Sequence, residues 1–130
     1  MDYQRSVDVD LPYEETVTRT RDALAEQGFG VLTEIDVRRT LLEKRGLEME
    51  PYVILGACNP DLAHRALEID RGVGVLLPCN VVVSSRPGGS TVRAMAPELM
   101  PEVTGLADLQ AVAEEASKRL QVVLDTLAAA

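Results

Sequence analysis

Aromatic residues are scarce in this sequence: its 130 residues include three tyrosines, one phenylalanine and no tryptophan. So few rings cannot build the stacking platform of a single-strand nucleic-acid binder or an aromatic sugar-binding shelf. Long apolar runs are absent too, because the run from Tyr52 to Cys58 is far shorter than the roughly 20 residues that span a bilayer. We therefore expect an aliphatic core and no membrane-spanning segment.

Basic residues are outnumbered, 13 against 21 acidic ones, which gives a formal net charge of −8. Residues 1–30 carry three basic and seven acidic side chains, residues 97–130 carry two and six, and the middle of the chain is balanced. Neutralisation by Lys and Arg supplies most of the attraction to nucleic acids and to anionic lipids. Since no segment forms a basic stripe, we expect neither a nucleic-acid nor a membrane partner.

Length and composition predict one domain over residues 1–130. Apolar residues make up 46% and charged residues 26%, as is typical of globular proteins. No basic segment followed by an apolar stretch stands at the start of the sequence, so no signal peptide is predicted. The expected location is the cytoplasm.

Hydrophobic periodicity predicts the elements of the first half of the chain. Alternation over residues 3–11 indicates a strand, in which Arg5 is the exception on the apolar side. A helix is expected from Pro12 to about Gly28, then a strand over 31–37 and a short polar helix over about 37–45. One face of the second strand is expected to carry Val31, Thr33, Ile35 and Val37.

The second half continues the alternation of strands and helices. A buried strand is predicted over Tyr52–Cys58, followed by a helix over about 60–70 with Asn59 as its N-cap and Pro60 at its first position. The clearest hairpin is predicted over residues 79–86 and 91–96. A loop is expected after Pro97. This order predicts an α+β two-layer sandwich, a mainly antiparallel sheet with helices on one face.

A last helix is expected to begin near Thr104 or Asp108. Its apolar residues recur at alternating spacings of three and four: Leu106, Leu109, Ala113, Ala116, Leu120, Val123 and Leu127. Such a stripe normally packs on the chain's own sheet. A coiled-coil-like contact with a second subunit is the alternative interpretation.

Both cysteines are followed directly by asparagine, and the chain has no other Cys or Asn. Cys58 and Asn59 end one predicted strand, while Cys79 and Asn80 begin another, so both thiols share a sheet edge if these strands are antiparallel neighbours. Amides at the start of the following helix would lower the pKa of Cys58 and favour a reactive or metal-binding thiolate. The alternative is a pair of buried cysteines acting as small hydrophobic residues. A structural disulfide is not expected in the cytoplasm.

A second candidate pair is Glu34 and Asp36, which share a face of the predicted strand at positions i and i+2. Two carboxylates there could bind a cation or share a proton. Alternatively they form a solvated strand edge, with Asp36 capping the next helix. The single histidine, His64, could pair with Cys58, since both lie near the start of the same predicted helix, but no third, orienting group is indicated, so no complete catalytic set can be assembled.

Three sequence blocks resemble one known family. They are Gly28-Phe29-Gly30-Val31-Leu32-Thr33-Glu34-Ile35-Asp36-Val37, Gly56-Ala57-Cys58-Asn59-Pro60 and Leu76-Leu77-Pro78-Cys79-Asn80-Val81. Together they look like the domain-of-unknown-function 302 family. This resemblance implies a TATA-binding-protein-like β-α-β(4)-α sandwich that often dimerises, and it implies neither DNA binding nor a known activity.

We therefore expect a cytoplasmic, homodimeric domain that binds a small ligand or a partner protein without catalysis. Its cofactor, if any, is not specified by the sequence. The expected ligand-binding residues are Glu34, Asp36, Cys58, Asn59, Cys79 and Asn80. The alternative hypothesis is a thiol-based redox, sulfur-carrier or soft-metal-binding protein that uses Cys58 and Cys79.

Overall fold

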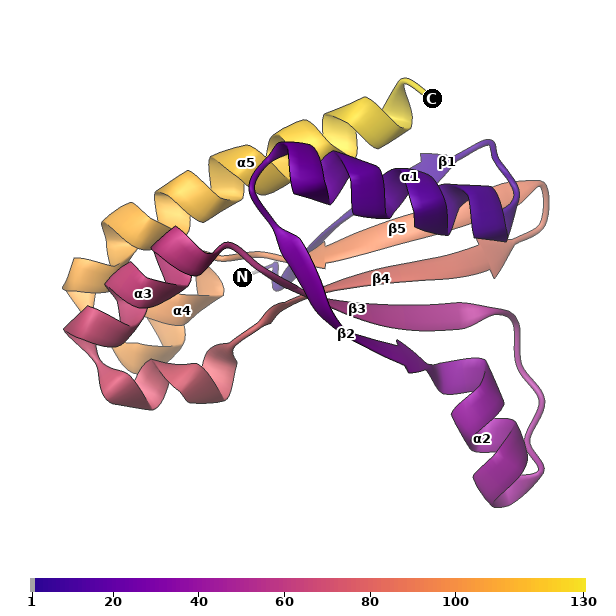
Figure 1. The fold of residues 1–130 in the computed structure, drawn as a ribbon, viewed down its shortest axis with the longest axis horizontal. Coiled ribbons are helices and arrows are strands. Elements are labelled where there is room, and N and C mark those ends of the chain that lie inside the picture. Colours follow the sequence, from indigo (N-terminus) through magenta and orange to yellow (C-terminus); the bar gives the residue numbers. More distant parts are fainter. Residues whose placement is uncertain (1) are drawn as a thin grey trace.

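Five antiparallel strands form one sheet in the order β1-β5-β4-β3-β2 (Figure 1). The computed structural model describes residues 2–130. The strands are β1 (Gln4–Val9), β2 (Gly30–Asp36), β3 (Tyr52–Cys58), β4 (Cys79–Arg86) and β5 (Gly89–Met95). Because every neighbouring pair is antiparallel, the predicted sheet type is confirmed.

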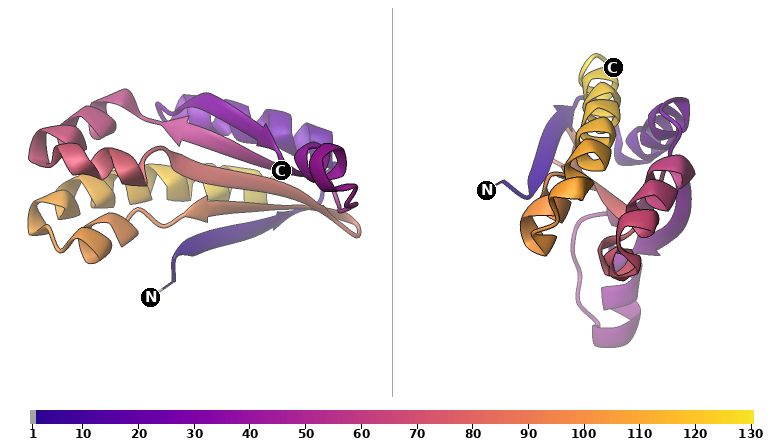
Figure 2. Two further views of the ribbon diagram at one scale, coloured as in Figure 1. Left: turned by 90° about the horizontal axis from the view of Figure 1, so that it is seen from below. Right: turned by 90° about the vertical axis from the view of Figure 1, so that its left-hand side faces the viewer.

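Helices α1 (Tyr13–Glu26) and α5 (Gln110–Ala128) lie on one face of this sheet, and α3 (Pro60–Ile69) lies beyond the end of its strands (Figure 1, Figure 2). Helix α2 (Val37–Arg45) extends from the end of β2, away from the other helices (Figure 1). The predicted β-α-β(4)-α sandwich is therefore confirmed, with α2 and α3 as excursions between strands. No helix within residues 2–130 combines the length and the apolar character needed to cross a membrane.

Two clusters of buried aliphatic side chains make up the core. The larger lies between the sheet and α1 and α5, and it includes Leu24, Leu55 and Leu120, which are at most 1% exposed. The smaller joins α3, a short helix α4 (Leu99–Thr104) and the start of α5, with Leu62 and Met100 among its members. Each fully buried aliphatic side chain contributes about 1.5–3 kcal/mol from removal of apolar surface from water.

The stripe on the last helix packs against its own chain. Six of its seven residues, from Leu109 to Leu127, are buried, while Leu106 precedes the helix and is 36% exposed. The coiled-coil interpretation of this stripe is therefore wrong, because the rest of the same chain covers these six residues. The helix starts later than expected, at Gln110, after a single 3-10 turn. Helix α4 occupies the segment predicted to be a loop.

The side chains of β2 do not share faces of the sheet as predicted, because the strand contains a β-bulge. Val31 pairs with Ala57, but Thr33 pairs with Gly56, so the register shifts at Leu32. The extra residue reverses the alternation, which leaves Val31 on the helix side and puts Thr33 on the other. The prediction that Val31, Thr33, Ile35 and Val37 share one face is therefore wrong. Val37 already belongs to α2.

Arg5 departs from the apolar pattern of β1 because it joins β1 to the helix layer. Its Nη2 lies 2.7 Å from Glu98 Oε1, and its Nη1 donates to the Ser117 carbonyl oxygen at 3.3 Å. The guanidinium thus links three segments that are far apart in the sequence.

Candidate functional site

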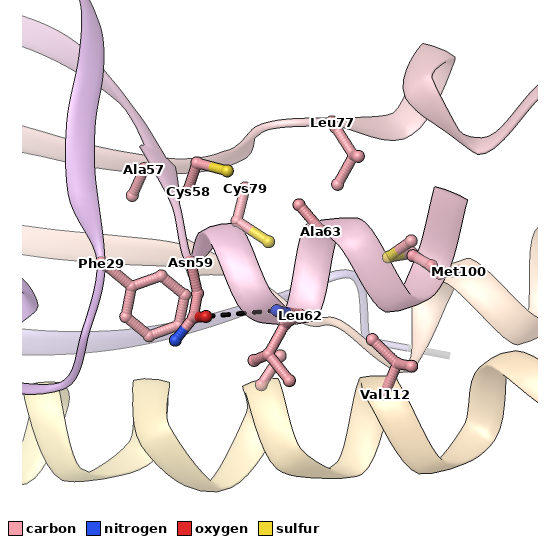
Figure 3. Close-up of a pocket in the computed structure, with 12 residues that line it drawn as sticks. Phe29, Ala57, Cys58, Asn59, Leu62, Ala63, Leu77, Cys79, Met100 and Val112 are labelled. Carbon is pink, nitrogen blue, oxygen red and sulfur yellow. Dashed lines mark hydrogen bonds between the residues drawn. The ribbon is translucent and has the colours of Figure 1, made fainter. Parts of the chain in front are cut away.

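A small cavity lies at the end of the sheet where β3 stops and β4 begins (Figure 3). Helix α3 starts directly after β3, and it covers the cavity together with the beginning of α5. The cavity has a volume of about 30 Å³. Its lining is almost entirely apolar: Phe29, Ala57, Cys58, Asn59, Leu62, Ala63, Ala66, Leu77, Cys79, Met100, Val112 and Ala116.

Both cysteines border this cavity. Strand β3 pairs with β4 so that Ala57 faces Cys79, which places Cys58 one residue beyond that pair. The expectation that the two thiols share one sheet edge is therefore confirmed. Cys79 is buried and Cys58 is half-buried, and neither forms a disulfide.

Burial raises the pKa of both thiols. The pKa of Cys79 rises from 9.0 to about 11, chiefly through desolvation and further through the nearby Cys58. Desolvation also raises the pKa of Cys58. The expected lowering of the Cys58 pKa by the start of α3 is therefore wrong. The physical reason is that the apolar surroundings disfavour a thiolate, while the Leu62 amide donates to Asn59 Oδ1 at 3.2 Å.

The two asparagines have different environments. Asn59 is buried, caps α3 through its side chain and borders the cavity, as the predicted N-cap requires. Asn80 pairs with Gly56 and is exposed on the opposite face of the sheet, which the helices leave uncovered. Only one of the two Cys-Asn pairs therefore brings its amide to the cavity.

The carboxylates Glu34 and Asp36 lie elsewhere. They pair with Leu55 and Val53, on the helix side of the sheet and several residues along β3 from Cys58. Glu34 Oε2 lies 3.0 Å from Nη2 of Arg21 on α1. Asp36 caps α2 by accepting from the Arg39 amide at 2.9 Å. The pair thus shares a face, as predicted, but does not reach the two thiols.

Met100 was not singled out by the sequence, although its side chain lines the cavity with the two cysteines. It belongs to α4, and because a loop was predicted there, no helical face was available from which to infer that Met100 is buried. His64 is exposed and its Nε2 lies 3.3 Å from Glu68 Oε1 on the same helix, so it is not part of the cavity lining. Within residues 2–130, no group of three or more His, Cys, Asp or Glu side chains could hold a metal ion.

Comparisons with known proteins identify the family but no activity. A family model described as "Domain of unknown function DUF302" matches residues 5–127. The crystal structure of an uncharacterized conserved DUF302 protein from Bacillus stearothermophilus is similar, with a TM-score of 0.90 and 34% sequence identity over 98% of this chain and 99% of that one. No curated protein matches the sequence. The chain therefore belongs to the DUF302 family.

Proposed function

We propose that this chain is a non-catalytic binding domain whose ligand is a soft, thiophilic metal ion such as Cu(I). The observation that carries the proposal is that three sulfur-bearing side chains line one apolar cavity: Cys58 and Cys79 lie together at the start of α3, and Met100 lies toward the far end of that helix (Figure 3). They come from three separate elements, the end of β3, the start of β4 and helix α4. Thiolate and thioether ligands favour Cu(I) over hard cations, which prefer oxygen.

The size of the cavity favours an ion over an organic ligand. A volume of about 30 Å³ admits only two or three atoms of carbon size. Even the best small ligands gain no more than about 1.5 kcal/mol per heavy atom, so such a molecule would bind with about millimolar affinity or weaker. Metal–thiolate bonds are not subject to that limit, because each bond is far stronger than a van der Waals contact.

The protonation state of the two thiols favours metal binding over redox catalysis. The raised pKa values keep both thiols protonated at neutral pH, whereas reactive cysteines depend on a lowered pKa. A metal ion changes this balance, because a thiol that coordinates it releases its proton to solvent as the sulfur–metal bond forms. Uptake of one ion by Cys58 and Cys79 would thus release two protons, and the thioether of Met100 would release none.

The test is an anaerobic titration of the reduced protein with Cu(I) in competition with a chromogenic Cu(I) chelator. We expect one ion per chain. Cys58→Ala and Cys79→Ser should each weaken binding by more than about 100-fold, the upper range for loss of an outer-shell partner. Met100→Leu should weaken it by about 10-fold. Met95→Leu is the matched control, because Met95 lies on β5 outside the cavity and should leave affinity unchanged.

Two results would refute the proposal. The first is wild-type protein that takes no Cu(I) from the chelator. The second is binding that survives in folded Cys58→Ala protein at wild-type affinity. Circular dichroism of each variant separates lost coordination from lost structure.

A further inference from the structure

The face of the sheet away from α1 and α5, called here the open face, carries an arginine on β5, a strand that is paired on both sides. Arg93 on β5 lies opposite Val82 on β4 and opposite Ser6 on β1. Val82 in turn lies opposite Ile54 on β3. The guanidinium therefore emerges from a central strand and has aliphatic neighbours on one side. Its side chain is half-buried there.

Arg93 has no carboxylate partner within residues 2–130. It takes part in none of the ion pairs of that region, and its Nη1 donates to Ser84 Oγ at 3.0 Å. By contrast, Arg86 at the end of β4 pairs with Asp8 at 3.5 Å and with Asp10 at 3.1 Å. The other arginines without an ion pair are exposed to water: Arg38, Arg45 and Arg65. Arg93 thus combines partial burial with an uncompensated charge and unused donors.

The surroundings of Arg93 form a groove of about 340 Å³, which lies within the usual size range of small-molecule sites. The residues that line it include Tyr3, Tyr52, Asn80, Val82, Arg93 and Met95. Polar donors come from Arg93, from the exposed amide of Asn80 and from the amide of Gln4. The two tyrosines, Val82 and Met95 supply apolar surface. A ligand that fits this groove has one anionic end and an apolar body.

We propose that the open face binds a small monocarboxylate with an aliphatic or aromatic body. The planar guanidinium of Arg93 presents a fork of N–H donors that matches the two oxygens of a carboxylate. The Asn80 amide can donate a further hydrogen bond to the same group. The apolar body then covers Val82 and Met95. This site lies on the opposite side of the sheet from the cavity at Cys79, so it does not depend on the function proposed above.

Macromolecular partners fit this face less well. A twofold face-to-face contact whose axis passes near Arg93 would bring two Arg93 side chains toward each other, and like charges oppose such a contact. A nucleic acid would require several cations, whereas the second arginine of this face, Arg86, is already paired. A single anionic group satisfies the one unpaired charge.

The test is NMR titration of the 15N-labelled full chain with sodium octanoate, with octanamide as the neutral probe of equal length. We expect amide shift changes on β4 and β5 around Asn80 and Arg93, and octanoate affinity about 10- to 100-fold above that of octanamide, as charge-assisted hydrogen bonds imply. Arg93→Gln should abolish that preference. Arg65→Gln makes the same charge change on α3, outside the groove, and should leave it intact.

Several results would overturn the proposal. They are equal affinity for octanoate and octanamide, an unchanged preference in folded Arg93→Gln protein, shift changes centred on the Cys79 cavity, and a dimer in sedimentation whose interface covers the open face. Stronger binding of inorganic phosphate than of octanoate would also overturn it, because the apolar half of the groove would then contribute nothing. A Cys58→Ala variant should bind octanoate with wild-type affinity, because Cys58 does not line the groove. The octanoate result therefore does not depend on whether the chain binds Cu(I).

Discussion

Cys79 should make the metal-free protein progressively less stable in alkaline solution. The pKa of its buried thiol is about 11 in the folded protein, against 9.0 for an ordinary cysteine. Above pH 9 the unfolded chain loses this proton, while the folded chain keeps it until about pH 11. The unfolded state then binds fewer protons, so the free energy of unfolding falls as the pH rises. The stabilisation is complete below pH 9 and is lost between pH 9 and 11.

The size of the effect follows from the two pKa values. One pKa unit corresponds to about 1.4 kcal/mol, so the loss approaches about 2–3 kcal/mol at pH 11. A domain of this size typically has a total stability of about 5–15 kcal/mol, which makes the loss easy to measure. Because Cys79 is only 8% exposed, solvent screening reduces the effect little.

The assay is urea denaturation at pH 8, 9, 10 and 11, with reductant and chelator present, on wild type and Cys79→Ala. At pH 8 the variant should be less stable, because it loses the packing of the sulfur. That deficit should shrink by about 2–3 kcal/mol by pH 11, while tyrosine and lysine titration cancels between the two proteins. A deficit that stays constant from pH 8 to 11 would refute the reasoning. Cys58→Ala, at a half-buried position, should show a smaller change.

Two further predictions concern the framework around the cavity. Leu55→Ala should cost about 2–5 kcal/mol in urea unfolding, because Leu55 is fully buried at the centre of β3. Leu47→Ala should change stability by less than about 0.5 kcal/mol, since Leu47 is 53% exposed, and similar losses for both would contradict the assigned core. Asn59→Ala should cost about 1–2 kcal/mol through loss of the α3 cap, and Asn59→Asp should retain most of that stability. Equal unfolding midpoints for the two Asn59 variants would show that the cap contributes nothing.

Local signals in the sequence predicted most of the elements. Helix α2 begins after Asp36, whose side chain caps it, and ends at Gly46, whose φ of 65° suits glycine. Helix α3 begins with Asn59 as cap and Pro60 in the first turn. Such caps act within three or four residues, so neighbouring residues specify them without help from the rest of the fold.

Features that depend on distant segments were not predictable in the same way. The bulge at Leu32 follows from how β2 pairs with β3, and it reversed the predicted facing of Thr33. The role of Arg5 depends on Glu98, which lies in a distant part of the sequence and meets it only in the folded chain. Met100 reaches the cavity because α4 packs against α5. None of these contacts has a counterpart in local periodicity.

For the candidate site, the sequence by itself determined that Cys58 ends one strand and Cys79 begins another, because hydrophobic runs and turn residues mark where β3 stops and β4 starts. That these two strands are neighbours was decided by their pairing in the folded sheet. Only the tertiary structure decided their chemistry. Packing of α3 and α5 over Cys79 removes water from the thiol, and this raises its pKa, although the position of Cys58 before a helix predicted the opposite for that residue. Local spacing positions a group along the chain, whereas its charge state depends on everything that surrounds it in space.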